Sequence, residues 1–174
     1  MKRYKSLFKK KISTTKYGLV FLENEFDKNK YSKWKRANVT YRGMKQKGKS
    51  NEVYGSFGKG LYTVPLSNKS MAKQYGDLYF TINAIPKKPK VVQSLNAAEV
   101  WRQNLISDFC KKNNKEYNTS FFEKNTSIEK EAIKLGLDGL IIKGREMVNY
   151  KPKDILYFKD EQQVMNYYET LSVN

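Results

Sequence analysis

The stretch Phe57-Gly58-Lys59-Gly60-Leu61-Tyr62 carries most of the information on fold and function in this sequence. Its two glycines allow a tight turn and let a ligand or another strand approach the backbone closely. The residues over 59–64 predict a strand, which Pro65 ends because proline has no backbone N–H to donate. The simplest interpretation is a glycine-rich hairpin in which Tyr62 belongs to a hydrophobic core.

A short helix is predicted directly after this strand. Ser67 is the expected N-cap, since its hydroxyl group suits the unpaired N–H groups of a first helical turn. The helix is expected to continue through Tyr75 and to end at Gly76 in the C′ position, where glycine is favoured.

Short strands and helices follow one another along the rest of the chain. Strands are predicted over residues 17–22, 38–41, 78–85, 140–143, 147–150 and 155–158. Helices are predicted over residues 96–112, 127–136 and 160–171. Thr126 and Glu129 fit a capping box at the start of the second helix, and residues 44–57 read as a loop. This pattern predicts an α+β domain.

The composition excludes several classes of active site. The chain has no histidine and one cysteine, Cys110, so histidine-dependent triads and Cys/His zinc sites are ruled out, and no metal is expected. A single cysteine forms no internal disulfide and fits a reducing compartment. No apolar run has the length of a membrane-spanning helix. We expect one domain at residues 17–174 after a basic arm at 1–16, and a cytoplasmic monomer without a membrane partner.

The positive charge is unevenly distributed along the chain. The net charge is +17, and residues 1–90 hold 22 Lys and Arg against 5 Asp and Glu, whereas residues 91–174 hold 12 of each. This asymmetry indicates a surface for a polyanion, or simply a lysine-rich composition. The candidate nucleic-acid-binding residues are cations with one aromatic among them: Lys9, Lys10, Lys11, Lys33, Trp34, Lys35 and Arg36.

Three segments far apart in the sequence resemble the NAD-binding core of the ADP-ribosyltransferases. They are Tyr41-Arg42-Gly43, the glycine-rich stretch that runs on to Tyr75, and Gly144-Arg145-Glu146-Met147-Val148. The second is similar to the Phe-Gly-x-Gly-(Ile/Leu)-Tyr signature of the diphtheria-toxin and poly(ADP-ribose)-polymerase branch. The third resembles the Glu-x-(Ile/Val)-x-Tyr strand of that branch. Small phage and mobile-element transferases share this sequence pattern, which covers roughly residues 41–158 of this chain. The resemblance therefore implies that the protein acts in the cytoplasm of a bacterial or phage-infected host cell.

The resemblance implies a split β-sandwich with an NAD cleft, a few peripheral helices and an Arg-Tyr-Glu triad. Glu146 would be the catalytic carboxylate that stabilises the cationic ribose as nicotinamide leaves. Tyr62 and Tyr75 would stack on the two faces of nicotinamide. Arg42 would steady the phosphates or ribose of NAD, and Gly43 would bond the nicotinamide amide through its backbone.

Two further residues are assigned to NAD by the same resemblance. Gly60 would let the ligand approach the backbone. A serine usually lies three residues before the second tyrosine, but this chain has Ala72 there, so Ser70 is the candidate for that bond.

The segment before Glu146 bears on the acceptor. Transferases that modify arginine carry a second glutamate two residues before the catalytic one, where this chain has Gly144, so an arginine acceptor is disfavoured. The resemblance implies mono-ADP-ribosylation, and the charge asymmetry favours a nucleic acid, RNA or DNA, or a protein bound to one as the acceptor.

Two alternatives from the sequence stay open. One is an NAD glycohydrolase, and the other is a catalytically silent basic protein that binds nucleic acid. In the second case Glu146 is a solvent-exposed strand residue and Arg42 belongs to a surface ion pair.

Overall fold

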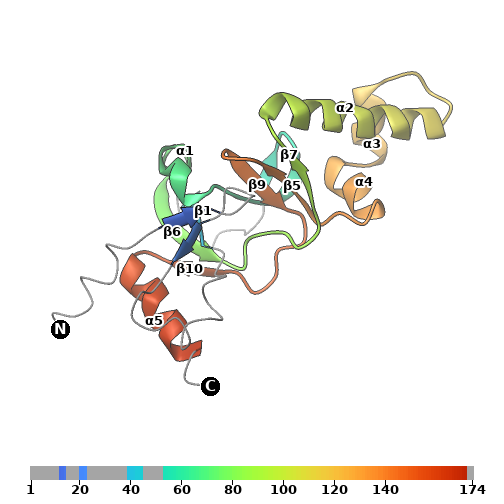
Figure 1. Cartoon of the computed structure of the whole chain (residues 1–174). Coiled ribbons are helices and arrows are strands. Elements are labelled where there is room, and N and C mark those ends of the chain that lie inside the picture. The colour runs from blue at the N-terminus through green and yellow to red at the C-terminus, as the bar shows by residue number, and fades with distance from the viewer. Residues whose placement is uncertain (1–11, 15–19, 23–38, 45–52, 172–174) are drawn as a thin grey trace. The chain divides into compact units, whose positions relative to one another are not determined.

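The fold is α+β, with several small sheets and five α-helices in the part of the chain that is described (Figure 1). The computed structural model describes residues 12–14, 20–22, 39–44 and 53–171. The chain forms two compact units. The first contains Met1–Lys47, Thr63–Ala84 and Asp154–Asn174, and the second contains Gly48–Tyr62 and Ile85–Lys153.

The first unit is built on an antiparallel three-stranded sheet in the order β10-β6-β3. Its strands are β3 (Thr40–Met44), β6 (Asp77–Ile82) and β10 (Leu156–Phe158). The 3₁₀ turn η3 (Leu66–Asn68) and helix α1 (Lys69–Lys73) precede β6, and helix α5 (Glu161–Leu171) follows β10. A separate hairpin pairs β1 (Ile12–Thr14) with β2 (Val20–Leu22).

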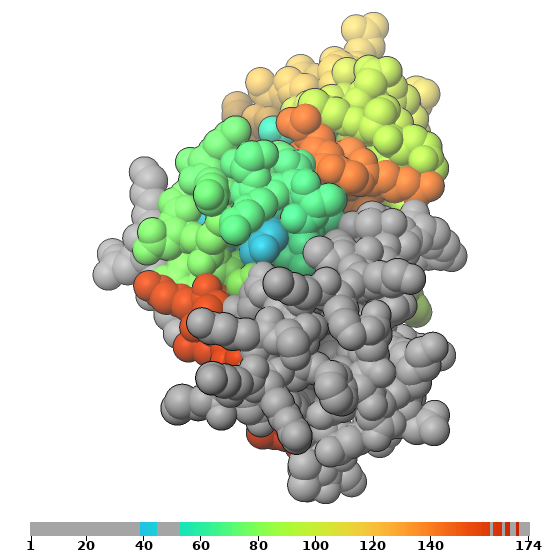
Figure 2. Space-filling model, turned by 60° about the vertical axis from the view of Figure 1, so that its left-hand side comes forward, coloured from blue at the N-terminus to red at the C-terminus, as the bar shows by residue number. Residues whose placement is uncertain are grey.

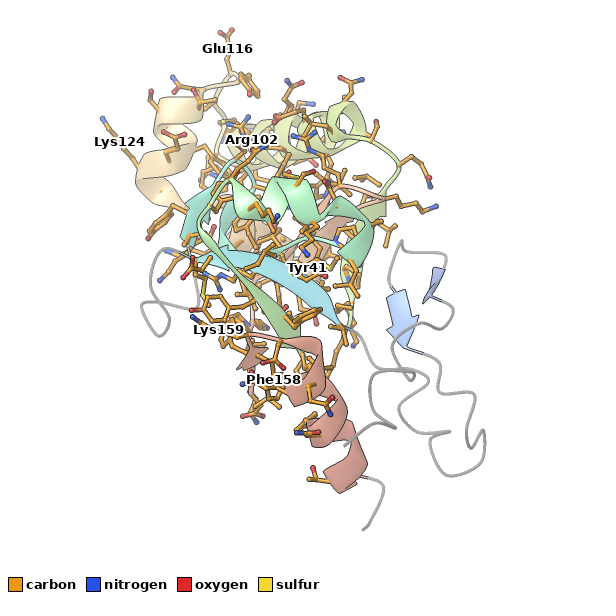
Figure 3. All side chains as sticks on the ribbon, turned by 90° about the vertical axis from the view of Figure 1, so that its left-hand side faces the viewer. Tyr41, Arg102, Glu116, Lys124, Phe158 and Lys159 are labelled. Atoms are coloured by element: carbon orange, nitrogen blue, oxygen red, sulfur yellow. The ribbon has the colours of Figure 1, made fainter. Side chains whose placement is uncertain are left out.

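One face of this sheet is apolar because side chains alternate along each strand. Val39 and Ile82 pack with Val164 of α5. Tyr41, labelled in Figure 3, packs with Ala72 of α1. The apolar face therefore packs against α1 and α5, the two α-helices described in this unit.

The other face of the sheet is polar, although most of it is buried. Thr40 and Thr81 lie opposite each other and join their hydroxyl groups in a hydrogen bond. Arg42 lies opposite Tyr79, and the ammonium group of Lys159 lies 5.6 Å from the centre of the Tyr79 ring (Figure 3).

The second unit is built on a five-stranded sheet in the order β4-β5-β9-β8-β7. The strands are β4 (Val53–Gly55), β5 (Gly58–Thr63), β7 (Pro89–Val92), β8 (Gly139–Ile142) and β9 (Glu146–Asn149). The pair β7–β8 is parallel, and parallel neighbours need a long crossover. Here the crossover consists of α2 (Leu95–Lys112), α3 (Thr119–Asn125) and α4 (Ile128–Lys134), with α3 and α4 beside α2 in Figure 1.

The core of the second unit lies between the helices and one face of the sheet. Trp101 and Leu105 of α2 pack with Leu140 and Ile142 of β8. The side chain of Ser94 caps α2 by accepting a hydrogen bond from the N–H of Ala97. The buried residues of this helix therefore form its core face.

Most predicted elements are present within a few residues of their expected bounds, but four were missed and three predicted caps are wrong. Strand β1 lies within the predicted basic arm at residues 1–16. Strand β4 lies within the predicted loop at 44–57, and neither β7 nor α3 was predicted. The N-cap of α1 is Asn68, because Ser67 lies inside the 3₁₀ turn. The helix ends earlier than predicted, with Gln74 as its C-cap, so Gly76 lies at C″ and not at C′.

The predicted capping box of α4 does not form. The hydroxyl of Thr126 donates instead to Oε1 of Glu131 at 2.6 Å, which also accepts from Lys134 at 2.7 Å. The carboxylate of Glu129 accepts a hydrogen bond from the backbone N–H of Lys59. A bond to a residue five positions later and a bond to the distant Lys59 thus replace the predicted capping box.

None of the helices in the described segments has the length and apolar character needed to cross a membrane.

Candidate functional site

Gly43 lies where β3 meets the end of α1 in the first unit. A Cβ atom at this position would lie 1.8 Å from the carbonyl oxygen of Ala72 and 3.1 Å from Cβ of Tyr75. Any side chain here would collide with a backbone atom, so the close approach requires glycine. Two of the segments singled out in the sequence are thereby brought together in the first unit.

The backbone groups of Gly43 point away from β6. Tyr41 donates its N–H to the carbonyl of Val64 and accepts from the N–H of Val64, both at 2.9 Å. In an antiparallel ladder, residues two apart direct their N–H and C=O groups to the same edge. The N–H and C=O of Gly43 therefore point to the edge on which Val64 lies, where a donor and an acceptor stand side by side.

The tyrosine whose Cβ atom lies near Gly43 is accessible. Tyr75 is 60% exposed, although its N–H bonds the carbonyl of Ala72 at the end of α1. Ser70 is exposed on the same helix, and the residue packed against Gly43 is Ala72. In Figure 2 a small cyan part of β3 reaches the surface beside the green segment that includes α1.

Arg42, the neighbour of Gly43, is buried on the polar face of the sheet. One of its guanidinium nitrogens donates to the hydroxyl of Tyr157 at 3.2 Å. Burial raises the pKa of the Tyr157 phenol, and Arg42 opposes that rise. Tyr157 was not predicted as a partner of Arg42, since the two residues are 115 positions apart.

Tyr62, in the second unit, has its hydroxyl group fixed by the turn that precedes it. The hydroxyl donates to the carbonyl of Gly58 at 2.8 Å and accepts from the N–H of Phe57 at 3.2 Å. The ring lies against Gly55, where a Cβ atom would be 2.5 Å from its Cζ. The tyrosine thus braces the β4–β5 hairpin with its hydroxyl and one side of its ring.

Glu146 begins β9 in the same unit as Tyr62, with its side chain 17% exposed. Nε of Arg145 lies 3.4 Å from its Oε1. Burial raises the pKa of the Tyr62 phenol, and the charges of Glu146 and Glu129 add to that rise, while the bond from Phe57 opposes it.

Gly60 is closely packed against β9. A Cβ atom here would lie 2.6 Å from a methyl group of Val148 and 2.7 Å from the carbonyl oxygen of Asn149. The glycine lets β5 and β9 approach each other, which accounts for it without a ligand.

Glu129 is a residue of this region that the sequence assigned only to a cap. Its Oε2 accepts a hydrogen bond from the N–H of Lys59 at 3.1 Å, and a Cβ atom on Gly58 would come within 2.6 Å of the same oxygen. Tyr150 adds a bond from its hydroxyl to the carbonyl of Phe57 at 2.9 Å. Three side chains therefore hold the glycine turn: Tyr62, Glu129 and Tyr150.

The residues expected to bind nucleic acid lie outside the described segments. These are the cations and the tryptophan at positions 9–11 and 33–36.

Comparison with models of protein families, with curated proteins and with solved structures finds no match to this chain.

Proposed function

We propose that the chain is an NAD-dependent mono-ADP-ribosyltransferase. The observation that carries the proposal is the packing of Gly43 against Ala72 and Tyr75 in the first unit. Nicotinamide has a carboxamide that needs one donor and one acceptor, and a flat ring that needs an aromatic face. The N–H and C=O of Gly43 offer that donor and acceptor at a strand edge, and Tyr75, whose Cβ lies near Gly43, offers an exposed aromatic side chain.

Glu146 supplies the charge that the reaction needs. The bond between C1′ of the ribose and the nicotinamide nitrogen breaks, and its electron pair leaves with nicotinamide. The ribose becomes cationic, and a partly buried carboxylate stabilises it. A nucleophile of the acceptor then forms a bond to C1′ and gives up its proton.

The other assigned side chains bind and orient. The Tyr62 ring is held in place by the bonds of its hydroxyl to the glycine turn, so little freedom is lost when a planar ring stacks on it. Arg42, held by Tyr157, provides a fixed positive charge for the phosphates or the ribose of NAD.

The acceptor favoured by the charge distribution is a nucleic acid or a protein bound to one. The excess of positive charge lies entirely in residues 1–90. If water is the acceptor, the same chemistry makes the chain an NAD glycohydrolase.

The experiment is release of nicotinamide from NAD, followed by chromatography, with and without RNA or DNA. We expect turnover by the wild-type chain and transfer of label from adenine-labelled NAD to the polymer. Tyr75→Ala is expected to raise KM for NAD, whereas Tyr117→Ala, which removes another exposed tyrosine, is expected to leave it unchanged. Nicotinamide release without labelled polymer would identify the glycohydrolase, and no release with retained binding of nucleic acid would identify a silent binding protein.

A further inference from the structure

Tyr54 is the most exposed of the large hydrophobic side chains in the described segments, at 82%. It lies in the middle of β4, an edge strand of the five-stranded sheet in which all three residues are exposed. Burial of a tyrosine ring contributes strongly to stability, so a ring left almost wholly in water is available for a ligand.

A cation accompanies this ring. Tyr54 and Lys59 are directly opposite each other in the β4–β5 register, so their side chains share one face of the hairpin. The ammonium group of Lys59 lies 5.8 Å from the centre of the Tyr54 ring, within the range of a cation–π interaction. The ring and the charge are thus held together by the strand pairing itself.

The hairpin around this pair is firmly held. The N–H of Lys59 is bonded to Glu129, and Tyr62 packs on the neighbouring residue Gly55. Since residues alternate between the two faces of a strand, Tyr62 uses the face opposite to that of Tyr54. The exposed pair therefore sits on a rigid support and takes no part in the contacts of Tyr62.

We propose that Tyr54 and Lys59 form a binding surface for single-stranded nucleic acid, in which an unpaired base stacks on Tyr54 and a phosphate binds Lys59. Stacking on an exposed aromatic beside a cation is the means by which proteins hold single strands without reading sequence. The choice of a polyanion follows from charge, because both residues lie in the part of the chain that holds the whole net charge of +17. In the proposed function this surface would hold the acceptor, and that role rests on the proposed function. Binding of the strand itself does not require turnover of NAD.

The test is fluorescence anisotropy with short labelled oligothymidylate and oligouridylate strands, measured over a series of salt concentrations. Loss of one stacked base costs about 1–3 kcal/mol, so Tyr54→Ala is expected to weaken binding by roughly 5- to 150-fold, while Tyr54→Phe keeps most of the affinity. Lys59→Gln is expected to reduce the slope of log affinity against log salt by about 0.7 to 1.

Tyr117→Ala is the matched control, because Tyr117 is also exposed, at 53%, in the same unit. Thermal unfolding of each variant establishes that it is folded. Wild-type affinity in Tyr54→Ala, or an equal loss in Tyr117→Ala, would overturn the inference, as would binding of a duplex as tight as that of the single strand. If the wild-type chain turns over NAD but Tyr54→Ala binds the strand as tightly as the wild type, the binding surface is wrong and the proposed enzyme stands. If binding of the strand depends on Tyr54 but the wild-type chain does not turn over NAD, the proposed enzyme is wrong and the surface stands.

Discussion

Replacement of Gly43 by alanine tests the close approach on which the candidate nicotinamide site depends. The new Cβ would lie 1.8 Å from the carbonyl oxygen of Ala72, whereas a comfortable carbon–oxygen contact is about 3.3 Å. The end of α1 must therefore move by about 1.5 Å. A backbone carbonyl has no rotamer by which to avoid the clash, so the strand and the helix have to separate.

The expected loss of stability follows from the cost of overpacking. Such insertions cost about 1–3 kcal/mol, and a rigid backbone neighbour favours the upper end. The backbone of Gly43 has no positive φ, so alanine brings no strain of its own and restricts the unfolded chain, which offsets about 0.4–1 kcal/mol. We expect a net loss of about 2 kcal/mol, or roughly 4–8 °C in Tm.

The assay is thermal unfolding together with titration of nicotinamide. Gly136→Ala is the control, because Gly136 has φ of +79° and nothing within 4 Å of an added Cβ, so it reports about 1–2 kcal/mol of backbone strain without a clash. Gly43→Ala is expected to lose nicotinamide binding, whereas Gly136→Ala keeps it. Unchanged Tm and unchanged binding in Gly43→Ala would refute the packing argument.

Further predictions concern the second unit. Glu129→Ala is expected to speed hydrogen exchange of the Lys59 amide by about tenfold, while Glu129→Gln, which keeps an acceptor oxygen, stays close to wild type; equal rates in both variants would contradict the assigned bond. Burial raises the pKa of the Tyr62 and Tyr150 phenols in the folded chain, so their protonated forms add stability. This stability is complete below the unfolded pKa of about 10 and is lost as the pH rises above it. Urea unfolding at rising alkaline pH is expected to show the loss, with a smaller loss in Tyr150→Phe, and a free energy of unfolding that does not change with pH would contradict the prediction. Glu131→Ala leaves Thr126 without its acceptor and is expected to cost about 1–3 kcal/mol at neutral pH, as measured by urea unfolding, and a change under a few tenths would show that the pair contributes little.

The sequence predicted those elements whose pattern is local. Helix α2 and the strand before Pro65 depend on neighbours within one or two turns, and both are present. Gly76 has a positive φ of 125°, but it lies one residue beyond its predicted C′ position. The α+β class follows from the number and order of such elements.

Elements stabilised by distant contacts were missed. Strand β7 begins at a proline and forms through its parallel pairing with β8, some fifty residues later in the chain. The three exposed residues of β4 carry no alternation of polar and apolar residues, and their partner is the glycine-rich strand β5.

The candidate site shows the same division. Gly43, Tyr75, Tyr62 and Glu146 were chosen by motif, but the contact of Gly43 with Ala72 joins residues about thirty positions apart and is visible only in the fold. Glu129 was predicted to cap a helix from its neighbours in sequence alone, and such a pattern does not include Lys59, whose N–H bonds the Glu129 carboxylate in the fold.

The most direct measurement of the proposed activity is nicotinamide release from NAD by the wild-type chain, by Glu146→Gln and by Glu123→Gln. Glutamine nearly matches the shape of Glu146 but lacks the charge that stabilises the cationic ribose, so we expect a fall in kcat on the order of 100-fold or more with little change in NAD affinity. Glu123 is an exposed residue of α3, and its replacement is expected to leave kcat unchanged. Turnover by Glu146→Gln at the rate of the wild type and of Glu123→Gln would contradict the account.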